Sequence, residues 1–310
     1  MNWTEKQIKK RIEKEKSIVI VGHRNPDGDS ISSSLGLATF LKEKYPQKNI
    51  YCISSSPKYI KDMFPSPDEV DDDTFFKSLL IIVDVSDLDR VEDKRAMEHK
   101  NIICFDHHIE NKKPPFLVLR DTSFISCSLL IFDFLIRKYS HMNKKIATYF
   151  YIGLITDSGR FLFDSSKKTF SLAKKLISYG VDYLPIYRQL YKKSASQLKF
   201  EGYVYSHYDV YKNITYLKMS KEEMEKNNFD FEMVSSSVNL LSDIDDRDIW
   251  VFFVEEEDHI KVELRSSRRD VQKIAIKFHG GGHKKASGCK IESFMKVQDV
   301  LDALLESEVI

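Results

Sequence analysis

The chain has 310 residues, of which 42% are hydrophobic and 31% are charged, so it is long enough for two domains with buried cores. Its 48 Lys and Arg residues nearly balance its 47 Asp and Glu residues, giving a formal net charge of +1. This balance excludes the strongly basic proteins that bind long nucleic acid through many phosphates, so any nucleotide substrate should be short.

The sequence predicts a cytoplasmic protein without a membrane anchor. Its longest apolar runs, at residues 79–83 and 149–155, are far shorter than the roughly 20 residues that cross a bilayer. Residues 1–16 are rich in Lys and Glu, which predicts an amphipathic helix rather than a secretory signal. The cysteines are widely spaced without a Cys-x-x-Cys pair, which predicts reduced and buried thiols at Cys52, Cys104, Cys127 and Cys289.

The first 184 residues predict an α/β domain built on a parallel sheet. Helix-like segments intervene between several apolar runs of strand length, which lie at residues 17–21, 50–53, 79–83, 102–105 and 116–119. Strands connected by helices favour a parallel sheet with helices on both faces.

The helices of this domain are predicted from the spacing of apolar residues. The segment 30–45 has helical periodicity, with Ser30 as its expected N-cap. Further helices are expected at 126–139, 144–155 and 167–179, and Gly180 is the expected C-terminal stop of the last one.

The rest of the chain predicts a linker and a second domain. Residues 185–205 begin at Pro185 and predict a helical linker. Residues 206–310 predict a smaller α/β domain with a mixed sheet, because short turns join consecutive strands. Its expected strands are 209–211, 214–217, 249–254, 259–264 and 287–291, and its expected helices are 231–241, 271–278 and 297–305.

Histidine and carboxylate side chains follow four apolar segments of the first domain. In chain order these residues are His23, Asp27 and Asp29, then Asp84, then Asp106, His107 and His108, and finally Asp157. In an open parallel sheet, ligands bind beyond the carboxyl ends of the strands, so these side chains are expected to converge. Together they can supply two metal ions.

The residue types indicate the kind of metal site. Imidazole mixed with carboxylate, without thiolate, favours manganese, with magnesium or cobalt as substitutes, over a closed structural zinc site. Two ions about 3.5–4 Å apart would share a carboxylate and a water that becomes hydroxide, and would neutralise charge on a phosphoryl oxygen. Taken alone, Asp84 could cap a turn and the Asp-His-His triplet could form a hydrogen-bonded surface turn. Four such segments in one domain favour the metal site.

These segments resemble the motifs of the DHH phosphoesterase family. The family order is followed by His23-x-x-Pro26-Asp27-x-Asp29, Asp84, Asp106-His107-His108 and Asp157-Ser158-Gly159, and Gly280-Gly281-Gly282-His283 is similar to the signature of the associated C-terminal domain. The two-domain arrangement is most similar to the branch of oligoribonucleases (nanoRNases) and pAp phosphatases. Ser32 and His279 stand where this branch commonly has glycine, which bears on substrate preference more than on catalysis.

The resemblance implies a role for each residue of the first-domain motifs. It divides the ligands between two manganese ions, with His23, Asp27 and Asp84 on the first and Asp29, Asp84, His107 and Asp157 on the second. Asp84 is then the bridge. The resemblance also implies that His108 contacts the scissile phosphate and that Asp106 orients a ligand histidine.

The second domain carries candidate substrate-binding residues. The glycines Gly280, Gly281 and Gly282 could bring backbone N–H groups close to a phosphate, and His283 could add a donor; the alternative is a flexible turn between a helix and a strand. Arg265 and Arg268 belong to a basic cluster that suits bidentate phosphate contact, and the alternative is a solvated helix entry.

The predicted function is manganese-dependent hydrolysis of short nucleotides (nanoRNA, pApA or pAp) to nucleoside monophosphates by two-metal hydroxide attack. Short oligoribonucleotides or dinucleotides are the expected partners, without long nucleic acid or membrane, and a homodimer is left open. The rival functions are a cyclic di-AMP phosphodiesterase, a manganese pyrophosphatase and a noncatalytic nucleotide-binding protein. The pyrophosphatase is disfavoured by the glycine segment and the arginine cluster, and a noncatalytic protein would be expected to lack a ligand.

Overall fold

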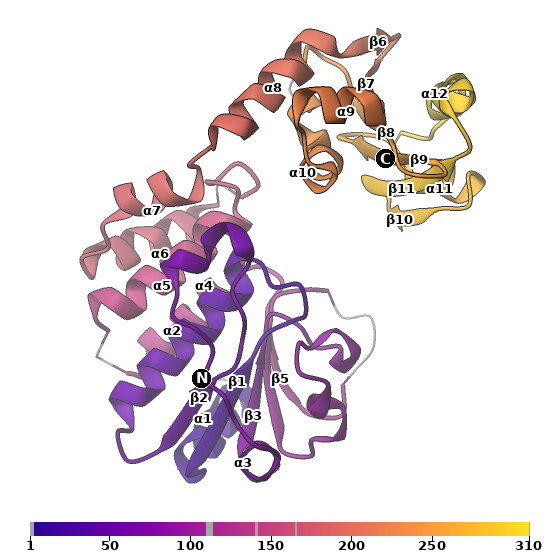
Figure 1. Ribbon diagram of the computed structural model, residues 1–310. Coiled ribbons are helices and arrows are strands. Elements are labelled where there is room, and N and C mark those ends of the chain that lie inside the picture. The colour runs from indigo at the N-terminus through magenta and orange to yellow at the C-terminus, as the bar shows by residue number, and fades with distance from the viewer. Residues whose placement is uncertain (1–2, 110–113, 140–141, 165, 243, 310) are drawn as a thin grey trace. The chain divides into compact units, whose positions relative to one another are not determined.

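The computed structural model describes residues 3–109, 114–139, 142–164, 166–242 and 244–309, shown in Figure 1. Met1 and Asn2 of the predicted N-terminal helix lie outside these residues. The chain divides into two compact units, residues 1–192 and 193–310, and the division falls within the segment expected to be a linker. Each unit has hydrophobic cores of its own.

The N-terminal unit contains a five-stranded parallel sheet, as predicted. Its strands are β1 (Ser17–Val21), β2 (Asn49–Cys52), β3 (Leu79–Val83), β4 (Ile102–Asp106) and β5 (Leu117–Arg120). The strand order is β2-β1-β3-β4-β5, and every neighbouring pair is parallel. The chain therefore reverses its direction of travel across the sheet between β1 and β3, and the carboxyl ends of these two strands are where an open α/β sheet binds its ligands.

Helices cover both faces of this sheet, which confirms the predicted fold class. One face packs in a large core with α1 (Trp3–Lys14), α2 (Gly28–Lys44), α4 (Cys127–Lys138), α5 (Lys144–Asp157) and α6 (Lys167–Ser178). The opposite face packs against Phe75 of α3 (Asp72–Lys77) and Ala96 of a short 3-10 helix. Side chains of β1, β3 and β4 alternate between the two cores, because successive strand residues point to opposite faces.

The start of α2 differs from the prediction. Ser30 was expected to be the N-cap, but the N-cap is Asp27, whose side chain accepts a hydrogen bond from the Ser30 backbone N–H at 2.9 Å. The helix therefore begins at Gly28, and its N-cap lies three residues earlier than predicted. This geometry places Asp29 in the first turn of α2, directly beside the turn that follows β1.

The C-terminal unit contains a six-stranded mixed sheet of order β10-β11-β9-β8-β7-β6, which confirms the predicted architecture. Its strands are β6 (Asp209–Tyr211), β7 (Ile214–Met219), β8 (Ile249–Glu255), β9 (Ile260–Ser266), β10 (Gly281–His283) and β11 (Ala286–Ile291). β7 and β8 are parallel, and the other neighbouring pairs are antiparallel.

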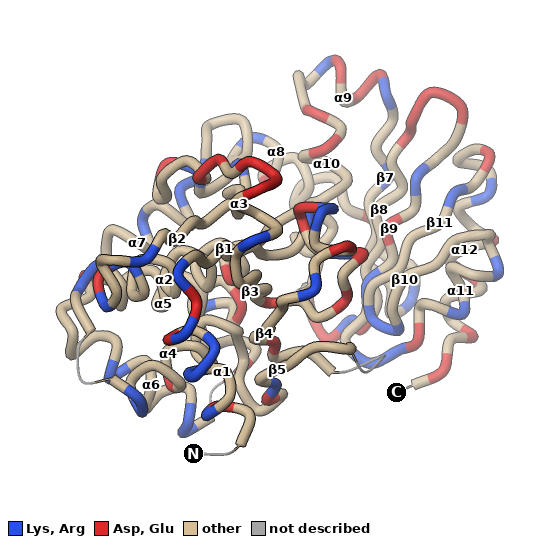
Figure 2. The backbone as a smooth tube through the Cα atoms, turned by 90° about the horizontal axis from the view of Figure 1, so that it is seen from below, with Lys and Arg blue, Asp and Glu red and all other residues tan. Residues whose placement is uncertain are grey.

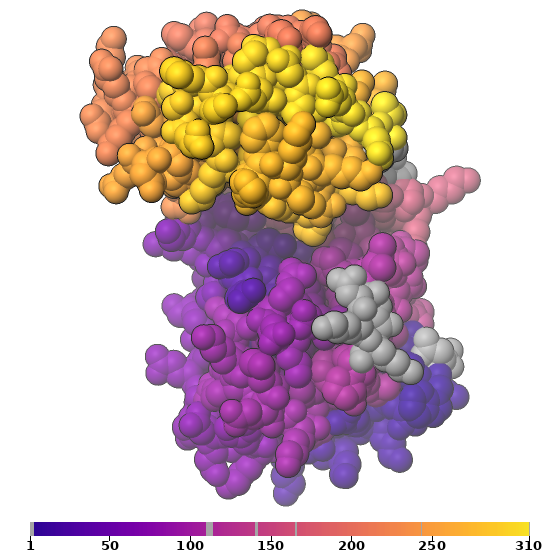
Figure 3. Space-filling model, turned by 90° about the vertical axis from the view of Figure 1, so that its right-hand side faces the viewer, coloured from indigo at the N-terminus to yellow at the C-terminus, as the bar shows by residue number. Residues whose placement is uncertain are grey.

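Two separate cores sandwich this sheet. On one face lie α11 (Gln272–Lys277) and α12 (Val297–Leu305), the latter visible in yellow at the surface of its unit in Figure 3. The other face packs against α8 (Ala195–His207), α9 (Lys221–Asn227) and α10 (Phe231–Ser236). The single helix expected at 231–241 is instead α10 followed by a 3-10 helix, Val238–Leu241. The remaining helix, α7 (Tyr183–Leu190), ends the N-terminal unit.

The glycine segment is partly a strand and is not the flexible turn that was its alternative interpretation. Gly281, Gly282 and His283 form β10, which pairs antiparallel with β11. A Cβ atom on Gly282 would lie 2.6 Å from the Ala286 carbonyl oxygen, and its φ of +136° is rare for other residues. Glycine therefore permits the close approach of β10 to β11.

The distribution of charged residues and cysteines agrees with the sequence-based expectations. Lys and Arg residues are interspersed with Asp and Glu residues in both units, as Figure 2 shows. All four cysteines are buried and free, as predicted. Among the described residues, no helix combines the length and apolar character needed to cross a membrane.

Candidate metal centre and active site

The predicted ligands of the N-terminal unit lie at the carboxyl ends of its central strands. His23 follows β1, Asp84 follows β3, and His107 follows β4. Asp29 stands in the first turn of α2, and Asp157 is the last residue of α5. Elements that are far apart in sequence thus converge on the switch point of the sheet.

The first cluster joins His23, Asp27 and Asp84. The Nε2 atom of His23 lies 3.4 Å from Asp84 Oδ2 and 3.7 Å from Asp27 Oδ2. One ligand atom from each of the three residues lies within 4.8 Å of the others, close enough to share one ion. Asp84 is almost fully buried, while Asp27 reaches solvent at the rim.

The second cluster joins Asp29, His107 and Asp157, again with ligand atoms within 4.8 Å of one another. The Nε2 atom of His107 lies 3.3 Å from Asp157 Oδ2 and 3.3 Å from Asp84 Oδ1. The two oxygens of Asp84 therefore face different histidines, one in each cluster. This is the arrangement that a bridging carboxylate requires.

The backbone conformation of Asp84 is unusual. Its φ is +64°, in the left-handed region that few residues other than glycine adopt. Its backbone N–H donates to the carbonyl oxygen of Phe105 at 2.8 Å, which fixes the residue against β4. Such strain persists where the surrounding structure imposes it, and it is common at functional sites.

Both histidines present the same ring nitrogen to the clusters. The Nδ1 atom of His23 donates to the Arg24 carbonyl oxygen at 2.9 Å, and the Nδ1 atom of His107 donates to that of Phe124 at 3.2 Å. Each Nε2 is then left as a lone-pair donor, which is the usual support of a metal-binding histidine. His107 Nε2 and Asp84 Oδ1 are also buried without a hydrogen-bond partner among the described residues. These residues fit a metal centre of mixed nitrogen and oxygen ligands.

Burial and mutual repulsion shape the charges of the candidate ligand side chains. Burial opposes a charge on His23, but the neighbouring carboxylates of Asp27 and Asp84 outweigh it and raise the pKa of His23 to about 10. Burial and the neighbouring charge of Asp84 raise the pKa of the Asp29 carboxyl above its usual range. Burial, with the charges of Asp29 and Asp84, raises the pKa of Asp157 in the same way. The centre therefore holds protons where cations would otherwise balance its carboxylates.

We expect metal binding to release protons at neutral pH. The pKa of His23 is raised from 6.5 to about 10, so its ion pairs stabilise the metal-free fold fully below pH 6.5 and are lost as pH rises through 10. A metal ion must displace this proton, so the apparent metal affinity should increase with pH up to about 10. Calorimetric titration of Mn²⁺ at pH 7.5, in two buffers of different ionisation enthalpy, measures the release. Equal heats in both buffers would contradict the assigned protonation.

His108 is held beside the centre by Asp106. The Nδ1 atom and the backbone N–H of His108 both donate to Asp106 Oδ1, at 2.9 and 3.1 Å. Arg120 donates to the other carboxylate oxygen at 3.1 Å. Burial acts against the charge on Asp106, but hydrogen bonds from His108 and Ser86 keep the pKa of Asp106 well below its usual range. Asp106 thus orients His108, and its implied role of orienting a ligand histidine stays a prediction.

Several contributors to the centre were not predicted. Tyr59, from the 3-10 helix Lys58–Met63, lies near Gly28 and Asp27 and is more than half exposed. The backbone N–H groups of Cys127 and Ser128 donate to Asp29 at 2.6 and 3.0 Å. Backbone N–H donors cannot be identified from residue types, and a single Tyr forms no motif. The only sequence signal for the α4 contacts was the helix start expected near residue 126.

We expect Gly153→Ala to destabilise the N-terminal unit and disturb this centre. A Cβ atom at Gly153 of α5 would lie 2.0 Å from Ser128 Oγ and 2.6 Å from Asp29 Oδ1. Overpacking of this kind costs about 1–3 kcal/mol. Thermal unfolding of the metal-free protein measures the loss, with Gly202→Ala in α8 as the matched control, because a Cβ there meets nothing within 4 Å. We expect that control to gain up to about 1 kcal/mol, and equal effects of the two substitutions would refute the steric argument.

The predicted substrate residues of the C-terminal unit lie along β9, β11 and β10. Arg265 of β9 and His283 of β10 are both in register with Ala286 of β11, so the three side chains share one face of the sheet. The Arg265 guanidinium donates to the Leu264 carbonyl oxygen at 2.9 Å and lies 3.2 Å from Glu263. On the same face, Gly288 stands opposite both Gly281 and Glu263. The two glycines carry no side chain, so the surface beside Arg265 and His283 is not covered at these positions.

The two other basic residues near Arg265 differ in surroundings. Arg268 is exposed, and its guanidinium has no hydrogen bond or ion pair with the described residues. Arg269 donates to Asp248 at 2.9 Å and to the Ser307 carbonyl oxygen at 3.0 Å, so it ties the end of the chain to the sheet. Arg268 is free to contact a ligand, and Arg269 is structural.

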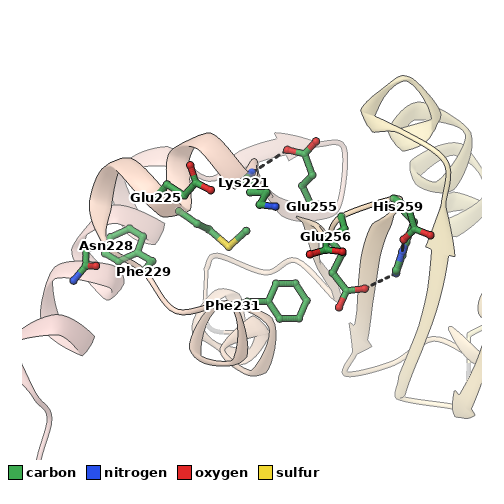
Figure 4. Close-up of a pocket in the computed structure, with 11 residues that line it drawn as sticks. Lys221, Glu225, Asn228, Phe229, Phe231, Glu255, Glu256 and His259 are labelled. Atoms are coloured by element: carbon green, nitrogen blue, oxygen red, sulfur yellow. Dashed lines mark hydrogen bonds and ion pairs between the residues drawn. The ribbon is translucent and has the colours of Figure 1, made fainter.

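A cavity of about 610 Å³ lies elsewhere in the C-terminal unit, between α9 and the turn that joins β8 to β9. Figure 4 shows Lys221 and Phe231 facing the acidic turn across this space. Among the described residues, its lining includes none of those predicted to bind metal or substrate. The large cavity is therefore separate from the chemistry proposed for this chain.

Comparison with known proteins identifies the domains and their relatives. Residues 17–154 match the family described as "DHH family, N-terminal domain", and residues 212–307 match the "DHHA1 domain". The bifunctional oligoribonuclease and PAP phosphatase NrnA of Bacillus subtilis is 32% identical over 290 residues, which cover 92% of each chain. The protein of the same name from Mycoplasma genitalium is 30% identical and covers 92% of this chain and 91% of its own.

A solved structure shares the fold of this chain. An exopolyphosphatase-related protein from Bacteroides fragilis superposes with a TM-score of 0.84 at 28% identity, over 98% of this chain and 95% of its own. The similarity spans both units, so it covers the metal centre and the β9–β11 face together. The chain therefore belongs to the DHH phosphoesterase family, in the branch of the bifunctional oligoribonuclease and PAP phosphatase NrnA, and is a hydrolase of phosphoester bonds.

Proposed function

We propose that this enzyme hydrolyses short nucleotides (nanoRNA, pApA and pAp) to nucleoside monophosphates, with two manganese ions as cofactors. The observation that carries the proposal is the pair of histidine–carboxylate clusters that meet at Asp84. The relatives from Bacillus subtilis and Mycoplasma genitalium are named for oligoribonuclease and PAP phosphatase activities, which supports the substrate class. Mixed imidazole and carboxylate ligands without thiolate support manganese, with magnesium or cobalt as substitutes.

The residues divide between the two ions as follows. The first ion would be held by His23, Asp27 and Asp84, and the second by Asp29, Asp84, His107 and Asp157. Bound ions of this kind supply an activated water and neutralise charge on phosphoryl oxygens. His23 and His107 must reach the bound state without the Nε2 proton, and their Nδ1–H bonds to backbone carbonyls keep that nitrogen directed inward.

His108 is the proposed contact to the scissile phosphate. Its Nδ1–H is committed to Asp106, so its Nε2 is the atom free to meet substrate, and its side chain is half exposed. Arg120 holds Asp106 from the other side. This chain of contacts would orient the ring so that an Nε2–H could donate to the phosphate and pass its proton to the leaving oxygen.

The β9–β11 face of the C-terminal unit is the proposed phosphate-binding surface. Arg265 and His283 lie on one face of the sheet, and the row beside them is lined by Gly281 and Gly288. Arg268 and the N–H group at Gly282 would add donors, whereas the Gly280 N–H already donates to the Ala275 carbonyl oxygen at 2.8 Å. A surface of this length suits one or two nucleotides rather than a long chain.

The compartment and assembly follow as parts of the same proposal. We place the enzyme in the cytoplasm, because its four free, buried cysteines are typical of a reducing compartment. A homodimer stays a prediction, which light scattering of the purified protein would decide.

The decisive assay uses four substrates. The protein is incubated with pAp, pApA, a five-nucleotide RNA and cyclic di-AMP, each with Mn²⁺ or with a chelator, and the products are separated by chromatography. We expect hydrolysis of pAp, pApA and the short RNA in Mn²⁺ and none in chelator. Preferred cleavage of cyclic di-AMP would replace this substrate assignment with the cyclic dinucleotide one, and no metal-dependent hydrolysis of any substrate would refute the proposal.

A further inference from the structure

The N-terminus of α4 is capped by a residue from a distant part of the chain. Ser126 is its N-cap, and the Ser126 hydroxyl accepts from the N–H of Leu129. The two N–H groups before Leu129 donate instead to Asp29, from Cys127 to Oδ2 at 2.6 Å and from Ser128 to Oδ1 at 3.0 Å. Three of the N–H groups that a helix start leaves unpaired are thus satisfied, two of them by one carboxylate from α2.

Two hydroxyl groups complete the surroundings of this carboxylate. Ser33 Oγ donates to Asp29 Oδ1 at 3.4 Å, and it lies 3.0 Å from Ser128 Oγ. Asp29, Ser33 and Ser128 are all fully buried. Gly153 leaves the space that this cluster fills, since a Cβ atom there would overlap both Ser128 Oγ and Asp29 Oδ1. The carboxylate therefore has little freedom to rotate.

We propose that Ser33, Ser128 and the first two N–H groups of α4 position Asp29 as a ligand of the second metal ion. The inference rests on the proposed function, because it assigns a support to one of the proposed ligands. A carboxylate has about four lone-pair sites, so the donors of α2 and α4 leave capacity directed to His107 and Asp157. The positive end of α4 also stabilises the negative charge on Asp29 beside that of Asp84.

The inference predicts selective loss of one ion. Removing a group that supports a metal ligand typically weakens metal binding by about 10–100-fold. Ser128→Ala and Ser33→Ala should therefore weaken binding of the second ion by this factor and leave the affinity for the first ion, on His23 and Asp27, unchanged. Because the two hydroxyls contact each other, the effects of the single substitutions should not add in the double variant.

The experiment is a Mn²⁺ titration followed by electron paramagnetic resonance of the free ion. The full-length variants Ser128→Ala and Ser33→Ala are compared with the wild type and with Ser32→Ala. Ser32 is the matched control, because it lies on the same helix, is equally buried, and its hydroxyl has no hydrogen-bond partner among the described residues. Circular dichroism and thermal unfolding of the metal-free proteins report the fold.

Each outcome decides between the claims. The inference is supported if the wild type and Ser32→Ala bind two ions with unchanged affinity, while Ser128→Ala and Ser33→Ala bind one of the two ions more weakly. The inference is overturned if both variants bind two ions with unchanged affinity. This holds even if the stability of the metal-free variants falls, because a purely structural role would produce that result. A wild type that binds fewer than two ions instead refutes the proposed function. If Ser128→Ala does not fold, Ser33→Ala decides, since it leaves the α4 backbone contacts in place.

Discussion

Asp84→Asn should lower kcat/KM for pAp and pApA by more than about 100-fold, since residues that only support a metal ligand already cost 10–100-fold. Asp84 faces His23 with one oxygen and His107 with the other, at 3.4 and 3.3 Å. An amide offers one neutral oxygen in place of two charged ones, so it cannot bridge. Metal-dependent hydrolysis, measured at saturating Mn²⁺, reports the loss.

Asparagine is the informative replacement because of the backbone. The φ of +64° at Asp84 is tolerated by Asn better than by most residues, so the variant should keep its fold. Alanine would add backbone strain, so a loss of activity could come from a disturbed fold as well as from the lost carboxylate bridge. Asp133→Asn is the control, because Asp133 pairs with Arg137 on α4 and has no part in the centre. If Asp84→Asn kept activity within about threefold of the control, the bridging role would be wrong.

Arg265→Ala should raise KM for pAp by about 10–100-fold and change kcat little. A hydrogen bond to a charged group contributes about 1.5–3 kcal/mol, which corresponds to this factor. The Arg265 guanidinium is already held by Leu264, Glu263 and Ser287, so it costs little to order when a phosphate binds. Initial-rate kinetics over a range of pAp concentrations separate KM from kcat.

Arg269→Ala is the matched control for this effect. Arg269 lies four residues further on, but its guanidinium contacts Asp248 and the Ser307 carbonyl oxygen. We expect a lower unfolding temperature and an unchanged KM. A fall in kcat for Arg265→Ala with no rise in KM would assign Arg265 to the chemical step instead of substrate binding.

The strands and most helices could be predicted from local patterns. A continuous apolar run such as 79–83 can only be a buried strand of the sheet or part of a buried helix, and its five-residue length decides for the strand. The same logic located Asp84, which directly follows such a run, and His23, which follows one after a single glycine. The predicted sheet, its helices and the mixed second sheet are confirmed.

Features that depend on distant partners could not be predicted. Ser30 and Asp27 are both good N-caps by residue type, and only the extended backbone at Asp27 selects it. The N–H donors of Asp29 come from residues 98 and 99 positions away. The strand β10 forms because it pairs with β11. This pairing cannot be predicted from the local sequence Gly-Gly-Gly-His alone.

The order of ligands along the chain has a consequence for synthesis on the ribosome. β1 is made first, yet it lies between β2 and β3, so it must wait for both neighbours before the sheet can close. Asp157 is the last ligand to emerge, at the end of α5. Because domains generally fold as units during translation, a nascent chain that ends before residue 157 cannot complete the metal centre. The enzyme should therefore become able to hydrolyse phosphoester bonds only after most of its first unit has left the ribosome.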